Sequence, residues 1–140
     1  MSQLDKVKWI DFPSVRDARG VLTAVEGGLD IPFDIQRIFY VHHPLTDRGG
    51  HAHRDTDQVV TAMAGSFKLR LSDGVRWVTY ELNDVTRGLY IPRMVYIEIK
   101  DMTPEAVCFV LASTHYDIAR SYRSWEDYLA AVRKAGEREP

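Results

Sequence analysis

Short segments in which apolar and polar side chains alternate dominate the chain. Residues 67–71 and 96–99 show the pattern most clearly. Because a strand turns successive side chains to opposite faces, this alternation is typical of half-buried β-strands. Asp73 followed by Gly74, between two such segments, predicts a β-hairpin. Strands are predicted at residues 21–25, 35–41, 58–63, 66–71, 75–82, 89–92, 95–99 and 106–112.

The C-terminal region alone shows a helical pattern. Ser124 is a good N-cap residue, and Asp127 lies three positions later, as in a capping box. Gly136 predicts the end of the helix, and residues 137–140 are expected to fray. One apolar stripe with helical spacing follows the cap, formed by Trp125, Tyr128, Leu129 and Val132.

The arrangement of these elements along the chain predicts one domain spanning residues 1–140. No internal repeat, low-complexity segment or linker interrupts the chain. Many short strands at regular spacing indicate an all-β barrel or sandwich, here with a short C-terminal α-helix.

Composition narrows the classes of partner. The net charge of -2 gives no general attraction for nucleic acid or an anionic membrane. Residues 1–10 contain no apolar stretch long enough for a signal peptide, and no segment approaches the length of a transmembrane helix. The single cysteine, Cys108, lies in an apolar run, which favours a reduced core thiol and a cytoplasmic location.

The strongest chemical signal is a pair of histidines, His51 and His53, preceded by Gly49 and Gly50. If this segment is a strand, both imidazoles face the same space. Two histidines on one face are either metal ligands or a proton-transferring pair. Neutral imidazole is the natural proton carrier near pH 7, whereas a purely structural role explains two such residues less well.

The order Gly50-His51-Ala52-His53 resembles the first motif of the cupin superfamily, in which metal-binding members add a glutamate and a further ligand, usually a histidine. Here the glutamate position falls near Asp57 and Gln58, and residues 88–98 contain no histidine. Two histidines and a glutamine make a poor site for a divalent ion. Asp55 or Asp57 would have to substitute, so proton transfer is favoured over metal binding.

A longer ordered set of motifs consists of residues 17–20, Glu26, residues 31–40, residues 48–53, Gln58, residues 65–66, residues 88–92, Met94, Val95, residues 111–113, Tyr116 and Asp117. This set resembles the bacterial sugar 3,4-ketoisomerases, the WxcM/FdtA-like cupins that act on dTDP-4-keto-6-deoxyglucose. The resemblance implies a cupin-type jelly-roll β-barrel that is dimeric and needs no metal or other cofactor. Departures are Gln36, where the family usually has lysine, and Tyr96, where it usually has tryptophan.

The resemblance implies roles for individual residues. His51 is expected to take the C3 proton, and Tyr40 to donate to the sugar oxygens. His53 is expected to relay a proton, to orient the reacting groups, or to protonate the oxygen. Arg37 interrupts an apolar strand, which favours a polar cavity around it. Arginines suit the diphosphate because they bind phosphate through two hydrogen bonds. The expected substrate contacts are Arg19, Arg37, Arg48 and Arg93 for the diphosphate, Glu26 for the base or ribose, Gln58 for the sugar, and Tyr90 and Tyr96 for the thymine.

Other functions remain open at this point. A dTDP-sugar 3,5-epimerase also uses histidine as a base, a metal-dependent oxygenase would use the same fold, and a sugar-nucleotide-binding cupin would lack catalysis. The expected partners are a dTDP-linked keto sugar and a second copy of the chain. In such a homodimer the strand near Arg19 is expected to reach the partner's site.

Overall fold

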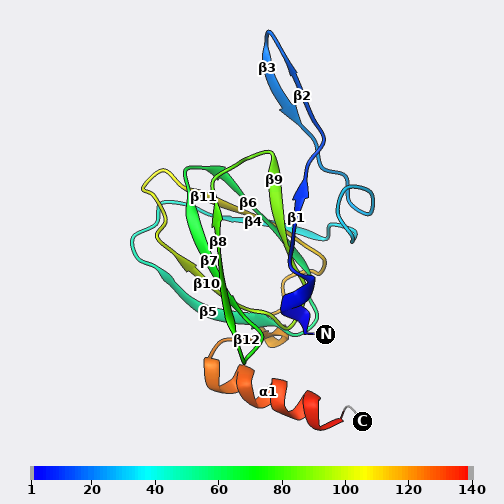
Figure 1. Cartoon of the computed structure of the whole chain (residues 1–140), viewed down its shortest axis with the longest axis vertical. Helices are drawn as coiled ribbons and strands as arrows, with labels where there is room; N and C mark the ends of the chain where they lie inside the picture. The colour runs from blue at the N-terminus through cyan, green and yellow to red at the C-terminus, as the bar shows by residue number, and fades with distance from the viewer. Residues whose placement is uncertain (1, 139–140) are drawn as a thin grey trace.

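Two five-stranded antiparallel sheets form most of the computed structural model, which describes residues 2–138 (Figure 1). The first sheet has the order β1 (Lys8–Asp11), β9 (Arg87–Ile91), β6 (Gln58–Ala64), β11 (Val107–Ala112) and β4 (Arg37–Val41). The second has the order β12 (Ser121–Tyr122), β5 (Arg48–His53), β10 (Tyr96–Lys100), β7 (Phe67–Ser72) and β8 (Trp77–Leu82).

The core lies between the two sheets because alternate residues of each strand face inward. Leu69 and Leu71 of β7 meet Val60 of β6 and Val110 of β11 there, together with Ile97 of β10. Burial of these side chains stabilises the fold by roughly 1.5–3 kcal/mol each. The predicted all-β architecture with a C-terminal helix is therefore confirmed.

The sheets form a sandwich and not a continuously hydrogen-bonded barrel. Among the strand pairings of residues 2–138, none joins β4 to β5 or β12. The first sheet therefore ends at β4, and the sandwich stays open on that side. This opening is where the cavity described below lies.

The predicted hairpin at Asp73 and Gly74 joins β7 to β8, with Ser72 opposite Trp77. Gly74 has a φ of 98°, a backbone conformation that glycine adopts easily. The second strand begins two residues later than predicted, at Trp77. The reason is that the Asp73 carboxylate accepts hydrogen bonds from the backbone N–H groups of Val75 and Arg76, which keeps these residues in the turn.

A separate hairpin of β2 (Ser14–Asp17) and β3 (Gly20–Thr23) stands away from the sandwich (Figure 1). Every residue of the two strands is exposed except Thr23, which is half-buried. The predicted strand at residues 21–25 corresponds to β3 but ends at Thr23.

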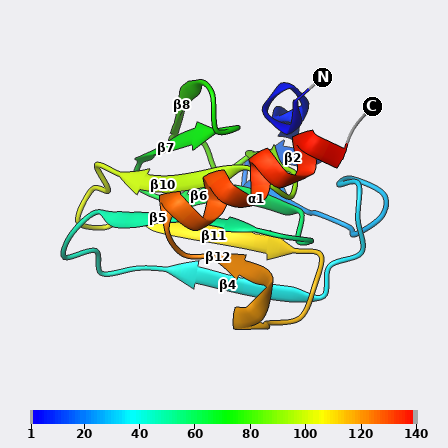
Figure 2. The same ribbon diagram turned by 90° about the horizontal axis from the view of Figure 1, so that it is seen from below.

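Helix α1 (Trp125–Arg138) lies against the second sheet beside β5 and β12 (Figure 2). Its start is as predicted, since the Ser124 hydroxyl accepts a hydrogen bond from the backbone N–H of Asp127 at 3.1 Å. The predicted stop at Gly136 is wrong, because this glycine lacks the positive φ that ends a helix and α1 continues to Arg138. Residues 139–140, part of the predicted frayed end, lie outside the described residues.

Two short 3-10 helices complete the described chain, η1 (Gln3–Lys6) and η2 (Ile118–Arg120). In residues 2–138 no helix has the length and apolar character needed to cross a membrane.

Candidate active site

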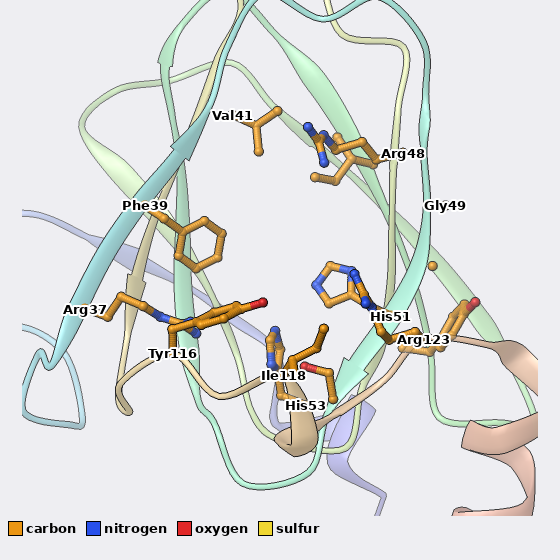
Figure 3. Close-up of a pocket in the computed structure, with 14 residues that line it drawn as sticks. Arg37, Phe39, Val41, Arg48, Gly49, His51, His53, Tyr116, Ile118 and Arg123 are labelled. Carbon is orange, nitrogen blue, oxygen red and sulfur yellow. The ribbon is translucent and has the colours of Figure 1, made fainter.

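A cavity of about 730 Å³ opens between the facing edges of the two sheets (Figure 3). This volume suits a ligand the size of a small organic molecule. Strands β4, β5 and β10 supply three walls, and the segment that follows β11 supplies the fourth. The lining residues are Arg37, Phe39, Val41, Arg48, Gly49, Gly50, His51, His53, Tyr96, Ile99, Tyr116, Ile118, Ser121 and Arg123.

His51 and His53 both face this cavity, as the spacing of two residues predicts (Figure 3). Their ring centroids are 5.1 Å apart, and the rings are nearly perpendicular. Ala52 between them points the other way and is fully buried in the cluster with Tyr96 and Tyr128 of α1. The helix therefore packs against the back of the strand that presents the two histidines.

Gly50 allows this strand to approach Tyr96 closely. A Cβ atom at this position would overlap the Tyr96 ring, so no larger residue fits without a shift. Tyr96 touches the edge of the cavity, but its ring is packed against Trp125 and Tyr128 with centroids 5.0 and 5.3 Å away. The close packing of strand β5 against the Tyr96 ring thus explains why this position is a glycine.

Burial holds both imidazoles neutral. It lowers the pKa of His51, and the cations Arg123 and Arg48 lower this pKa further. Burial also lowers the pKa of His53 to about 4, with smaller contributions from His51 and Arg37. Near pH 7 both rings are therefore uncharged, which is the form that accepts or relays a proton.

Three arginines, Arg37, Arg48 and Arg123, bring positive charge to the cavity. Within residues 2–138, no acidic side chain lines the cavity and none of the three arginines forms an ion pair. The buried Nε of Arg37 has no hydrogen-bond partner, although its guanidinium lies over the Tyr116 ring at 5.5 Å. Unpaired cations in a cavity suit an anionic ligand such as a diphosphate.

Gln58 lies behind His53 and not on the cavity wall. It is 2% exposed, and its amide nitrogen is 2.9 Å from Nε2 of His53. The predicted contact of Gln58 with the sugar stays a prediction, and in this structure the amide contacts His53 instead. In residues 2–138 no group of three or more His, Cys, Asp or Glu side chains is placed to hold a metal ion.

Three other predicted site residues lie away from the cavity. Tyr40 is on the opposite face of β4 from Arg37, because three positions in a strand reverse the face, and it is 59% exposed. Tyr90 belongs to the apolar cluster on the outer face of the first sheet. Arg93 is bound through two nitrogens to the carboxylate of Asp57. The structure does not support a contact of these residues with a ligand in this cavity.

Arg19 and Glu26 are also remote from the histidines. Arg19 lies at the turn of the β2–β3 hairpin, where its guanidinium binds the carboxylate of Asp17 at 2.6 Å. Glu26 is exposed in the loop that follows β3. Within one copy of the chain, these two residues do not reach the cavity.

The sequence prediction did not identify Arg123, or a cavity role for Tyr116 and Ile118. These residues follow the last long strand, in a segment without alternation. The segment reaches the cavity because β12 pairs with β5, placing Ser121 opposite His53. The only sequence signal for Arg123 was its position directly before the helix N-cap Ser124. Arginine is common there on protein surfaces, so this position does not indicate a cavity residue.

An open two-sheet sandwich with two neutral histidines in a cationic cavity defines a cupin-type enzyme that moves protons on an anionic ligand. The family model described as "FdtA: WxcM-like, C-terminal" matches residues 5–133, so the chain belongs to this family.

Characterised relatives are sugar 3,4-ketoisomerases. The chain is 35% identical over 130 residues to the TDP-4-oxo-6-deoxy-alpha-D-glucose-3,4-oxoisomerase of Aneurinibacillus thermoaerophilus, covering 89% of this chain and 94% of the relative. It is similar to the 3,4-ketoisomerase QdtA of Thermoanaerobacterium thermosaccharolyticum solved with TDP (TM-score 0.88, 38% identity, 92% and 96% coverage). A 3,4-ketoisomerase of Helicobacter canadensis is also similar (TM-score 0.87, 34% identity, 91% and 97% coverage).

Proposed function

We propose that the protein is a nucleotide-sugar 3,4-ketoisomerase that converts dTDP-4-keto-6-deoxyglucose to a dTDP-3-keto-6-deoxyhexose. The observation that carries this proposal is the pair of neutral imidazoles, His51 and His53, facing one cavity with unpaired arginines. The H51N mutant of the related QdtA was solved with TDP-4-keto-6-deoxyglucose, at 38% identity and a TM-score of 0.88, which supports the substrate class.

The reaction moves one hydrogen between carbons and one proton between oxygens. The C4 ketone acidifies the hydrogen on C3, and His51 removes it as a proton to give an enediol or enediolate. Protonation of C4 and transfer of the O3 proton to O4 then leave the ketone at C3 and a hydroxyl at C4. Since the hydrogen returns to the neighbouring carbon, the reaction balances without a redox partner.

The arginines provide binding and charge stabilisation in this proposal. Arg37, Arg48 and Arg123 surround the cavity at different points, so they are able to contact the diphosphate and the sugar oxygens at the same time (Figure 3). Donors placed where negative charge develops on the enediolate lower the barrier. Hydrogen bonds from charged donors are about twice as strong as neutral ones.

The His51→Asn variant tests this function. Removing the base is expected to lower kcat by about 10²- to 10⁴-fold, the usual contribution of general acid–base catalysis. His115→Asn is the matched control, because His115 does not line the cavity, and it should retain activity. Undiminished turnover in His51→Asn would contradict the assignment.

The product in deuterated water separates isomerase from epimerase. Incubation of dTDP-4-keto-6-deoxyglucose with the protein is followed by NMR. A ketone at C3 supports the proposal, whereas deuterium at C3 and C5 with the ketone still at C4 identifies a 3,5-epimerase. Tight binding of dTDP without turnover identifies a non-catalytic binding protein.

We also propose that the protein is a homodimer that uses the β2–β3 hairpin. Val15 and Leu22 on this hairpin are 64% and 66% exposed, and Ile38 and Tyr40 on the outer face of β4 are 55% and 59% exposed. Exposed apolar side chains gathered in this way mark interaction surfaces. A second copy that covers both regions would give Arg19 a route to its partner's cavity.

The oligomeric state tests this arrangement. Sedimentation or light scattering should show a dimer for the wild-type protein and a shift toward monomer for the double variant Val15→Ser/Leu22→Ser. Val75→Ser is the control, since Val75 is even more exposed, at 90%, but lies in the β7–β8 turn. A wild-type monomer at micromolar concentration would rule out the proposal.

A further inference from the structure

The contact between Gln58 and His53 constrains the chemistry of that histidine. Gln58 begins β6, the central strand of the first sheet, and is paired with Ile91 on one side and with Ala112 on the other. Its backbone is therefore held by both neighbouring strands. The side chain is buried, with the amide nitrogen 2.9 Å from Nε2 of His53.

The direction of this hydrogen bond follows from the groups involved. An amide nitrogen has two N–H donors and no lone pair to offer, so Nε2 of His53 accepts. A neutral imidazole has a proton on only one of its two ring nitrogens, so the N–H proton of His53 is on Nδ1. With Nε2 accepting and Nδ1 protonated, the His53 ring has no free lone pair.

We propose that Gln58 is a positioning residue that fixes His53 in the tautomer with the proton on Nδ1. In this state His53 is able to donate a hydrogen bond but unable to act as a base. The catalytic role that follows rests on the proposed ketoisomerase function. Of the two histidines, only His51 then has a free nitrogen lone pair that is able to accept the C3 proton. His53 serves the sugar oxygens through its N–H.

The chemistry of residue 58 makes the inference testable. A leucine at this position has a similar volume but no donor, so it would release the tautomer. A glutamate has nearly the same shape as glutamine, but its carboxylate only accepts. Gln58→Glu would therefore require a proton on Nε2, either as the opposite tautomer or as an imidazolium ion.

Nitrogen NMR of the histidine side chains reads the tautomer directly. In the wild-type protein at pH 7, Nδ1 of His53 should show the shift of a protonated nitrogen and Nε2 that of an unprotonated one, with the signals assigned from the His53→Asn variant. Gln58→Glu should show protonated Nε2, and Gln58→Leu should lose the wild-type state. A proton on Nε2 in the wild type would overturn the proposal, even if no variant at position 58 folds.

Thr61→Val is the matched control for burial and polarity. Thr61 lies on the same strand, is 4% exposed, and its hydroxyl donates to the backbone carbonyl of Arg87 on the other face of the sheet. This variant should keep the wild-type tautomer. An identical loss of the His53 signals in Thr61→Val and Gln58→Leu would show a general loosening of β6, and would refute the specific role.

Kinetics separate this inference from the proposed function. Gln58→Leu is expected to lower kcat by roughly 10- to 100-fold with a smaller change in KM, because it disturbs one of the two imidazoles and not the arginines. If the wild-type protein has the Nδ1 tautomer but no isomerase activity, the tautomer assignment stands and the proposed function fails. If the protein is an isomerase and Gln58→Leu has the kcat of the wild type, the positioning role is refuted.

Discussion

Replacing Gly50 with alanine should destabilise the protein through one contact. The added Cβ atom would overlap the ring of Tyr96, which is 5% exposed and packed between β5 and α1. Either the ring or strand β5 must move, and overpacking of this kind costs about 1–3 kcal/mol. For a chain of this length we expect Tm to fall by roughly 3–10 °C. Because His51 is the next residue, kcat should fall as well.

The neighbouring glycine supplies the control. A Cβ atom at Gly49 would have no atom within 4 Å, so Gly49→Ala should leave stability within about 0.5 kcal/mol of the wild type. Urea unfolding of both variants gives the free energies of unfolding. The two glycines are adjacent in one motif, so a difference between them reports the contact and not the loss of backbone freedom.

A double-mutant cycle identifies the contact partner. In a Tyr96→Leu background the ring is absent, so Gly50→Ala should cost at least about 1 kcal/mol less than in the wild type. The same free-energy cost in both backgrounds would refute the explanation, because the strain would then arise somewhere other than the Tyr96 ring. Equal stability of Gly49→Ala and Gly50→Ala would refute it more directly.

Three further predictions concern the site and its support. Arg123→Met should raise KM for the nucleotide sugar about 10-fold or more, because the substrate loses a hydrogen bond to a charged group. The same change should raise the pKa of His51, since the positive charge of Arg123 lowers it. An unchanged KM in steady-state kinetics would exclude Arg123 from substrate binding. Since the pKa of His53 is about 4 in the folded protein, the unfolded chain binds more protons between pH 6.5 and 4, so stability should fall as pH falls through this window. Urea unfolding at several pH values measures this loss, which His53→Gln should reduce. Tyr128→Phe should lower the free energy of unfolding by about 1–2 kcal/mol, because the buried hydroxyl donates its one proton to the carbonyl of Met94 at 2.8 Å, with the carbonyl of Ser72 next to it at 3.1 Å. Unchanged urea unfolding would contradict this contribution.

Local spacing predicted the central part of the site. The alternation of side chains in a strand placed His51 and His53 in one cavity, and the interruption of an apolar strand identified Arg37 as an inward charge. The same rule shows why Tyr40 could not join them. Arg37 and Tyr40 are three positions apart in β4, so a cavity that receives one turns the other outward.

Contacts between distant segments were beyond prediction from local patterns. Asp57 engages Arg93 through an ion pair that no spacing rule indicates. Arg123 reaches the cavity only through the pairing of β12 with β5. The small size of Gly50 is explained by the Tyr96 ring, a contact that depends on how the sheet and helix pack.

The fourth wall of the cavity has a consequence for engineering this fold. Tyr116, Ile118, Ser121 and Arg123 come from one continuous stretch of chain, while the histidines belong to a strand on another side. One wall of the cavity is thus encoded in a piece of sequence separate from the two histidines. Exchanging residues 116–123 between related chains would alter this wall of the cavity while the two histidines stay untouched.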